Sequence, residues 1–290
     1  MYRPVGIFYA YWTQEWDADF LPFVDKAKRL GFDLLELHAA VLSDRDRAYR
    51  LKVKKAADNA GILLSYGMGL AKAYDLSSTD EETRLRGVGF MKKIISAVGE
   101  MGGGPISGTV HSYWPGVLPE GAERKEPMLQ QSLKSMRELA PFALDQGVAL
   151  NVEVINRFEQ FLLNTCAEAL SYVAAVNSPA CNILLDTFHM NIEEDSLEGA
   201  IRLAGPRLAA LHLGEPNRMP PGTGRMPWAE IREALDSINF AGPLVMEPFV
   251  TPGGAVGRAV GVWRELAPEA GKDGLAEKAA AFVKQRLRPA

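Results

Sequence analysis

The sequence has few cysteines and no long apolar run, and both absences exclude classes of protein. Its 290 residues include 2 cysteines, Cys166 and Cys181, which are too few for a disulfide framework and form no CxxC metal pair. No apolar run is long enough to span a bilayer, and the first residues lack the basic and apolar regions of a secretory signal. We therefore expect a cytoplasmic protein with no membrane segment.

An excess of positive charge is also lacking. The formal net charge is −4. Because nucleic-acid phosphates are bound by basic faces, we expect no nucleic-acid partner. A hydrophobic content of 47% and a charged content of 23% are typical of a globular protein with a large core.

Eight strand-like segments alternate with helix-like segments along the whole chain. The expected strands are Val5–Tyr9, Asp33–Leu37, Leu63–Gly67, Ile106–Val110, Ala149–Val154, Asn182–Asp186, Leu208–His212 and Pro243–Glu247. Most are continuous apolar runs, as expected for parallel strands covered on both faces. Eight strict repeats without a linker predict an α/β fold, a single (β/α)₈ TIM barrel domain over residues 1–290. The first strand is not followed by a GxGxxG turn, which counts against a dinucleotide fold.

Local signals mark several helix boundaries. Residues 78–81 (Ser-Thr-Asp-Glu) and 165–168 (Thr-Cys-Ala-Glu) both have the pattern of a capping box. Gly31 follows an apolar stripe that runs from Phe20 to Leu30, so we expect it just after the end of a helix. Pro227 is expected in the first turn of a later helix.

Four consecutive strands each end in a carboxylate or an imidazole, namely Glu153, Asp186, His212 and Glu247. In a barrel the C-terminal strand ends meet at one face, where the chemistry of such folds is found. Buried carboxylates need partners, and one divalent cation would partner all four residues. Each residue alone is equally compatible with an ion pair, but four in register favour a metal site. Three carboxylates and one imidazole suit Mn²⁺, Mg²⁺ or Co²⁺ better than a thiolate-rich zinc site.

Histidines and aromatic residues gather at the same expected face. All four histidines, His38, His111, His189 and His212, lie at or just beyond an expected strand end. His189 lies beyond the sixth strand and is expected to reach substrate, whereas His111 either faces substrate or supports its loop. Six aromatic residues lie at or beyond the ends of the first and fourth strands: Phe8, Tyr9, Tyr11, Trp12, Trp16 and Trp114. Aromatic faces stack on sugars, although ordinary packing explains most of these six.

These motifs resemble those of the D-tagatose 3-epimerase family, which includes the D-allulose (D-psicose) 3-epimerases. The matching segments are Tyr9–Trp12, His111–Pro115, Glu153–Glu159, Leu185–Glu194, His212–Arg218, Gly224–Trp228 and Met246–Phe249. The resemblance extends from the first strand to the last helix. It implies a xylose-isomerase-like TIM barrel, an isomerase that interconverts C3 epimers of ketoses.

The resemblance also implies roles for individual residues. It assigns the metal ligands to Glu153, Asp186, His212 and Glu247, and contacts around O1–O3 of the ketose to Glu159, His189 and Arg218. It implies one bound divalent ion, which in this family is commonly Mn²⁺ or Co²⁺, with Mg²⁺ as an alternative. It also implies a homodimer or homotetramer.

Two positions depart from the family pattern, and both bear on substrate preference. Phe8 stands where some relatives carry Tyr, and Pro216 stands where Ser is more usual. Phe8 and Trp114 are expected to contact the substrate. The pairs D-fructose/D-allulose, D-tagatose/D-sorbose and L-ribulose/L-xylulose all remain open.

Inversion at C3 needs one proton removed from one face of the sugar and another delivered to the opposite face. We hypothesise that Glu153 and Glu247 are the two acid–base residues, acting through a cis-enediolate, while Asp186 and His212 bind metal only. Other isomerases of the superfamily, of the hydroxypyruvate isomerase or inosose dehydratase type, share the quartet and are the alternative. An endonuclease-IV-like enzyme would need more histidines and a basic face. A non-catalytic sugar-binding protein would not need two such carboxylates.

Overall fold

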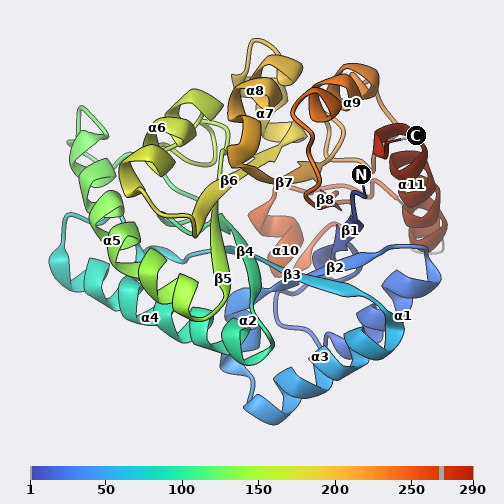
Figure 1. The fold of residues 1–290 in the computed structure, drawn as a ribbon, viewed down its shortest axis with the longest axis horizontal. Helices are drawn as coiled ribbons and strands as arrows, with labels where there is room; N and C mark the ends of the chain where they lie inside the picture. Colours follow the sequence, from blue (N-terminus) through green and yellow to red (C-terminus); the bar gives the residue numbers. More distant parts are fainter. Residues whose placement is uncertain (1, 268–270, 290) are drawn as a thin grey trace.

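The strands form a closed parallel barrel in the computed structural model, which describes residues 2–267 and 271–289. They pair in sequence order, and β1 pairs with β8 to close the ring. Figure 1 shows this inner ring of strands surrounded by helices. The strands are β1 (Val5–Phe8), β2 (Leu34–His38), β3 (Leu63–Gly69), β4 (Gly104–Thr109), β5 (Val148–Glu153), β6 (Cys181–Asp186), β7 (Leu208–Leu213) and β8 (Leu244–Met246). The expected single (β/α)₈ TIM barrel is confirmed, with strand boundaries shifted by one or two residues.

Most helices cover the outside of the barrel, whereas α10 lies near the centre of the ring in Figure 1. The α-helices are α1 (Leu21–Arg29), α2 (Ala39–Asp44), α3 (Arg47–Ala60), α4 (Glu81–Glu100), α5 (Glu126–Asp145), α6 (Cys166–Val176), α7 (Thr187–Glu193), α8 (Leu197–Ala204), α9 (Trp228–Ser237), α10 (Gly254–Ala259) and α11 (Lys272–Leu287). Short 3₁₀ turns are η1 (Tyr9–Trp12), η2 (Lys72–Tyr74) and η3 (Gly205–Arg207). Within the described ranges, no helix combines the length and the apolar character that a bilayer span requires.

The apolar runs of the strands are buried on both faces. The adjacent Leu184 and Leu185 in β6 are both fully buried although neighbouring side chains of a strand point to opposite faces, because side chains fill the barrel and helices cover it. Removal of apolar surface from water supplies about 25 cal/mol per Å². The continuous hydrophobic pattern is therefore what this layered arrangement requires.

The capping predictions had different outcomes. The box that begins at Thr165 is confirmed, since its side chain accepts from the Glu168 N–H and Glu168 accepts from the Thr165 N–H. The box predicted from Ser78 was wrong, because α4 starts after Asp80, whose carboxylate accepts from Thr83 N at 3.0 Å. The Ser78 hydroxyl instead accepts from Asp80 N in the preceding turn.

Two smaller boundary predictions also differ. Gly31, with φ of 82°, follows the end of α1 as expected, because a left-handed backbone there favours glycine. Pro227 immediately precedes α9 rather than occupying its first turn.

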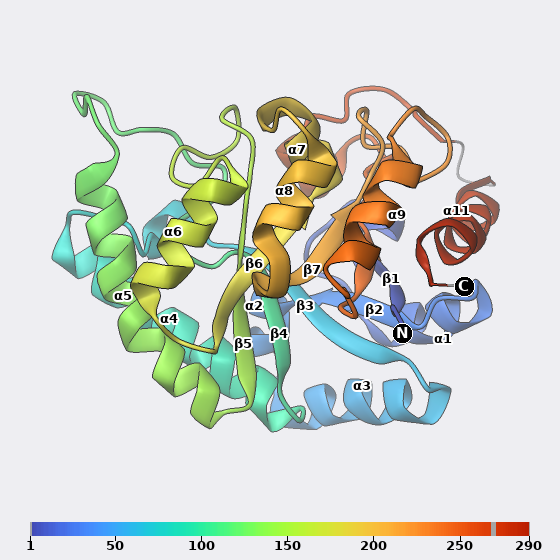
Figure 2. The ribbon, with the colours of Figure 1, turned by 45° about the horizontal axis from the view of Figure 1, so that its top comes forward.

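The buried Arg3 ties the two ends of the chain together. Its guanidinium donates to Phe240 O at 2.8 Å, to Leu287 O at 2.6 Å and to Asp236 at 2.7 Å. The two termini accordingly lie close together in Figure 2. These contacts join α11 to α9 and to the segment that leads into β1.

Two glycines of α4 provide a matched stability test. A Cβ on Gly87 would come within 2.4 Å of Tyr74 O, whereas a Cβ on Gly89 meets no atom within 4 Å. We expect Gly87→Ala to lower the free energy of unfolding by about 1–3 kcal/mol through overpacking. Gly89→Ala should raise it by about 0.5–1 kcal/mol, because alanine favours the helix. Urea unfolding of both variants checks this, and equal effects would contradict the role of Gly87 in seating η2 on α4.

Candidate metal and substrate site

Four side chains from successive strands converge at one end of the barrel. One ligand atom from each of Glu153, Asp186, His212 and Glu247 lies within 4.8 Å of the others. Glu153 and Asp186 end β5 and β6, and His212 is in β7. Glu247 follows β8, and its N–H donates to Leu213 O at 3.1 Å, which continues the strand pairing by one residue. This group could hold a metal ion.

The electrostatics of the quartet fit a cation. Burial, reinforced by the Glu247 charge, raises the pKa of Glu153 well above its usual value, and burial likewise raises the pKa of Asp186. For Glu247 the effect of burial is outweighed by His212 and Arg218, so its pKa is lowered. The negative charges of Glu153 and Asp186 are therefore not balanced by the cations of the protein. A hard divalent ion would balance them, and such ions prefer an oxygen-rich donor set.

Arg218 is the main cation facing the quartet. Its guanidinium donates to Glu247 Oε2 at 3.1 Å and lies 3.8 Å from Asp186 Oδ2. It is held between two aromatic rings, with Phe188 at 4.3 Å and Phe249 at 5.1 Å from its central carbon. These contacts hold a buried charge in one orientation despite the cost of desolvation.

Hydrogen bonds to Glu215 anchor the loop that carries Arg218. Arg218 N donates to Glu215 O at 2.9 Å across a turn in which Pro216 takes the second position, where its fixed φ is favourable. The buried Glu215 carboxylate accepts from Gly222 N, Met226 N and Trp228 Nε1 at 2.7–3.0 Å. Sequence reasoning missed this anchor, although a glutamate directly after an apolar strand was a visible signal.

His189 and Glu159 are linked through Asn156. Asn156 Nδ2 lies 2.7 Å from His189 Nδ1 and donates to Glu159 Oε1 at 3.0 Å. Trp114 Nε1 donates to the other oxygen of Glu159 at 3.2 Å. Burial and the Arg218 charge lower the pKa of His189 well below its usual value, so its ring is neutral. Asn156 was not singled out from the sequence.

Glu36 is a second residue that sequence reasoning missed. It lies in β2, yet its Oε1 is 3.0 Å from His212 Nε2 across the barrel interior. Ser65 Oγ donates to its other oxygen at 2.9 Å. Burial alone would lower the pKa of His212. The charges of Glu36 and Glu247 outweigh burial and raise this pKa well above its usual value. A carboxylate between the apolar residues of β2 was the available signal.

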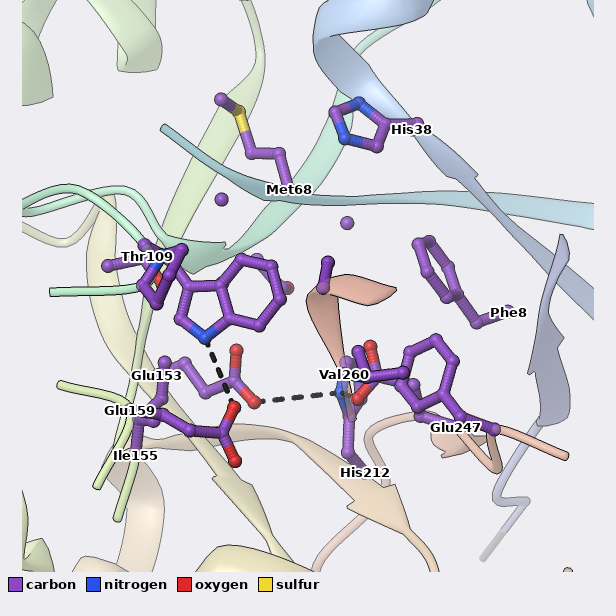
Figure 3. Close-up of a pocket in the computed structure, with 18 of the residues that line it drawn as sticks. Phe8, His38, Met68, Thr109, Glu153, Ile155, Glu159, His212, Glu247 and Val260 are labelled. Atoms are coloured by element: carbon purple, nitrogen blue, oxygen red, sulfur yellow. Dashed lines mark hydrogen bonds and ion pairs between the residues drawn. The ribbon is translucent and has the colours of Figure 1, made fainter. Parts of the chain in front are cut away.

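A cavity of about 350 Å³ opens above the quartet. All but one of the site residues expected from the sequence line it; Asp186 belongs to the quartet behind the cavity wall. The lining members are Phe8, Trp114, Glu153, Glu159, His189, His212, Arg218 and Glu247. Figure 3 shows the carboxylates and His212 at one end, with His38 and Met68 at the other. Ala259 and Val260, at the end of α10, also face the cavity.

Three of the six aromatics have the packing role that was expected for most of them. Tyr9 and Tyr11 are buried in the core, and Trp12 stacks on Phe23 with 5.8 Å between ring centroids. The other three, Phe8, Trp16 and Trp114, line the cavity.

The structure distinguishes between the two alternatives for His111. His111 is fully buried outside the cavity lining, and its ring packs against Tyr172 with 5.8 Å between ring centroids, which favours a supporting role over contact with a substrate. Glu159 does not pair with Arg157, which instead binds Glu193 at 2.7 Å.

The chain is similar to proteins of known family and structure. The family model described as xylose isomerase-like TIM barrel matches residues 24–276, which defines the class of protein. The D-psicose 3-epimerase of Agrobacterium fabrum (strain C58 / ATCC 33970) is 43% identical over 261 residues, 90% of each chain. The L-ribulose 3-epimerase of Methylomonas sp. (strain DH-1) is 32% identical and spans 95% of this chain and 94% of that protein.

A solved structure agrees closely with the whole fold. The D-psicose 3-epimerase from Clostridium cellulolyticum H10, crystallised with D-tagatose, gives a TM-score of 0.95 at 41% identity and covers 99% of this chain and 100% of that one. The chain belongs to the D-psicose 3-epimerase family of ketose 3-epimerases, as its motifs indicated. It is an isomerase of the carbohydrate epimerase type.

The buried His111 predicts an acid-sensitive fold. Burial lowers its pKa to about 3, below the value of roughly 6.5 for a free imidazole. Below pH 6.5 the unfolded chain therefore binds a proton that the folded chain does not, and stability falls by up to about 1.4 kcal/mol per pH unit. In His111→Leu, the loss of unfolding free energy between pH 7 and pH 5 should be smaller by about 2 kcal/mol. Urea unfolding at both pH values measures this, and an unchanged loss would refute it.

Proposed function

We propose that the protein is a metal-dependent 3-epimerase of free ketohexoses, with D-fructose/D-psicose as the leading pair and D-tagatose/D-sorbose next. One observation carries the proposal: the carboxylates of Glu153 and Glu247 both line one end of a single cavity, where they lie 4.0 and 3.7 Å from His212 Nδ1 (Figure 3). Two proton-carrying groups on two sides of a substrate are what inversion at one carbon needs. The greater identity to a D-psicose 3-epimerase than to an L-ribulose 3-epimerase supports a six-carbon substrate.

The quartet is proposed to hold one divalent ion, Mn²⁺ in the first place, with Co²⁺ and Mg²⁺ as alternatives. The oxygen-rich donor set supports this choice. When bound, the ion supplies polarisation of the C2 carbonyl and stabilises the negative charge that develops on the sugar oxygens.

The protein side chains move the protons. One of Glu153 and Glu247 removes the C3 proton to give a cis-enediolate, and the other delivers a proton to the opposite face; the reverse reaction exchanges their roles. Asp186 and His212 act as ligands only.

Three residues are proposed to hold the O1–O3 end of the sugar. Arg218 presents N–H donors beside Glu247, and the neutral His189 ring lies within 3.8 Å of Glu153 Oε1. Glu159 accepts from Trp114 and Asn156, which fixes its carboxylate near O1. Phe8 and Trp114 provide apolar faces for the sugar carbons.

We also infer the setting in which the enzyme works. Residues 1–290 are proposed to act as one domain, in a homodimer or homotetramer, in the cytoplasm. Exposed apolar side chains such as Phe158 and Trp263, 76% and 74% accessible, support assembly into an oligomer. Cys166 and Cys181 are free and buried, which is compatible with a reducing compartment.

Substituting each glutamate separately tests the two-base scheme. Glu153→Gln and Glu247→Gln should each slow epimerisation of D-psicose by at least about 10²-fold, because the amide carries no titratable proton. In ²H₂O each variant should still exchange the C3 proton of one epimer, and the two variants should differ in which epimer exchanges. NMR of the recovered sugars measures both effects.

The exposed Glu233→Gln in α9 is the matched control and should retain wild-type rates. Circular dichroism and bound-metal analysis show whether each site variant is folded and loaded. Full activity in either site variant would refute the scheme.

The contact between Glu36 and His212 predicts an effect on metal affinity. Carboxylates that orient a metal-binding histidine contribute about 10- to 100-fold to affinity. We therefore expect Glu36→Gln to weaken Mn²⁺ binding by that factor in calorimetric titrations of chelator-treated protein. Glu159→Gln, which changes a cavity carboxylate bonded to Trp114 and Asn156, should stay within about threefold of wild type. Equal affinities for Glu36→Gln and wild type would exclude the orienting role.

A further inference from the structure

The cavity has a second polar position at the end away from the quartet. His38 is two residues beyond Glu36 in β2, so both side chains lie on the same face of the strand, about 6.6 Å apart along it. Glu36 contacts His212 at the reacting end. His38 lines the opposite end, beside Met68 and away from Glu153 and Glu247 (Figure 3).

The surroundings of His38 are largely apolar. Its ring contacts Trp16 edge-on, with 5.7 Å between centroids, and Phe8 and Met68 line the same part of the cavity. Its Nδ1 is buried and has no hydrogen-bond partner among the described residues. The other ring nitrogen, Nε2, also has no hydrogen-bond partner among the described residues, and it is not closed off as Nδ1 is. A polar group of a ligand in the cavity would therefore gain a hydrogen bond to Nε2.

The chemical state of His38 fits a hydroxyl group. Burial lowers its pKa to about 4, so the ring is neutral at physiological pH. A neutral imidazole offers one N–H donor and one acceptor nitrogen. A sugar hydroxyl both donates and accepts, whereas an apolar chain end does neither.

We propose that His38 binds the hydroxyl on the terminal carbon of a six-carbon ketose whose O1–O3 end lies at the quartet. This inference rests on the proposed function, which sets the direction of the sugar in the cavity. His38 is then a specificity-determining residue, because only a substrate long enough to reach from the quartet to His38 forms this hydrogen bond.

The test compares D-psicose with 6-deoxy-D-psicose, which lacks only the terminal hydroxyl. Wild-type enzyme should prefer D-psicose by about tenfold in kcat/KM, the usual size of one hydrogen bond to a neutral group. His38→Ala should lower kcat/KM for D-psicose by about tenfold and leave that for the 6-deoxy sugar within about twofold. His38→Gln, which keeps a donor and an acceptor, should recover part of the preference.

Met68→Leu is the matched control at the same end of the cavity, because it changes shape without changing hydrogen bonding. It should alter kcat/KM for both sugars by the same factor. An equal loss for both sugars in His38→Ala, or the same preference in that variant as in wild type, would overturn the proposal.

A binding measurement separates this inference from the proposed function. Trp16 and Trp114 line the cavity, so quenching of their fluorescence reports sugar binding without turnover. If wild type turns over neither sugar, the proposed function fails, while the affinities of wild type and His38→Ala for the two sugars still test His38. If wild type epimerises D-psicose and His38→Ala binds both sugars as wild type does, only the role of His38 is lost.

Discussion

Mutual repulsion of three buried carboxylates is the constraint on which the rest of the site depends. Glu153, Asp186 and Glu247 reach within 4.8 Å of one another with His212 among them. Removing such charges from water is costly unless opposite charge is supplied. The protein supplies part of it through Arg218, whose guanidinium packs against the rings of Phe188 and Phe249. The negative charge that Arg218 does not balance makes the quartet a candidate cation-binding site.

The barrel scaffold holds these charged side chains close together. Hydrogen bonding around the closed ring fixes the strand ends, so each carboxylate is placed by a rigid element and not by a loop. The loops add further residues, and the hydrogen bonds of Glu215 anchor the segment that carries Arg218. Asn156 similarly holds His189 and Glu159 at fixed separation. The chemistry is therefore preorganised.

The two ends of the cavity differ in polarity. The carboxylates and His212 lie at one end, and His38 and Met68 lie at the other (Figure 3). Electrostatic stabilisation is strongest in a site shielded from water, which the aromatic walls and the end of α10 provide. A barrel of this kind is a shared fold, and its function is carried by the site that it holds.

The sequence by itself determined the barrel and the quartet. Strict βα alternation and polar residues at four successive strand ends are local patterns, and barrel geometry brings strand ends together without further information. Only the tertiary structure decided that Glu36 of β2 reaches His212 of β7, that Asn156 joins His189 to Glu159, and that His111 faces away from the cavity. These contacts cross the barrel interior or join separate loops. Their partners are set by side-chain packing in three dimensions, which no periodicity along the chain encodes.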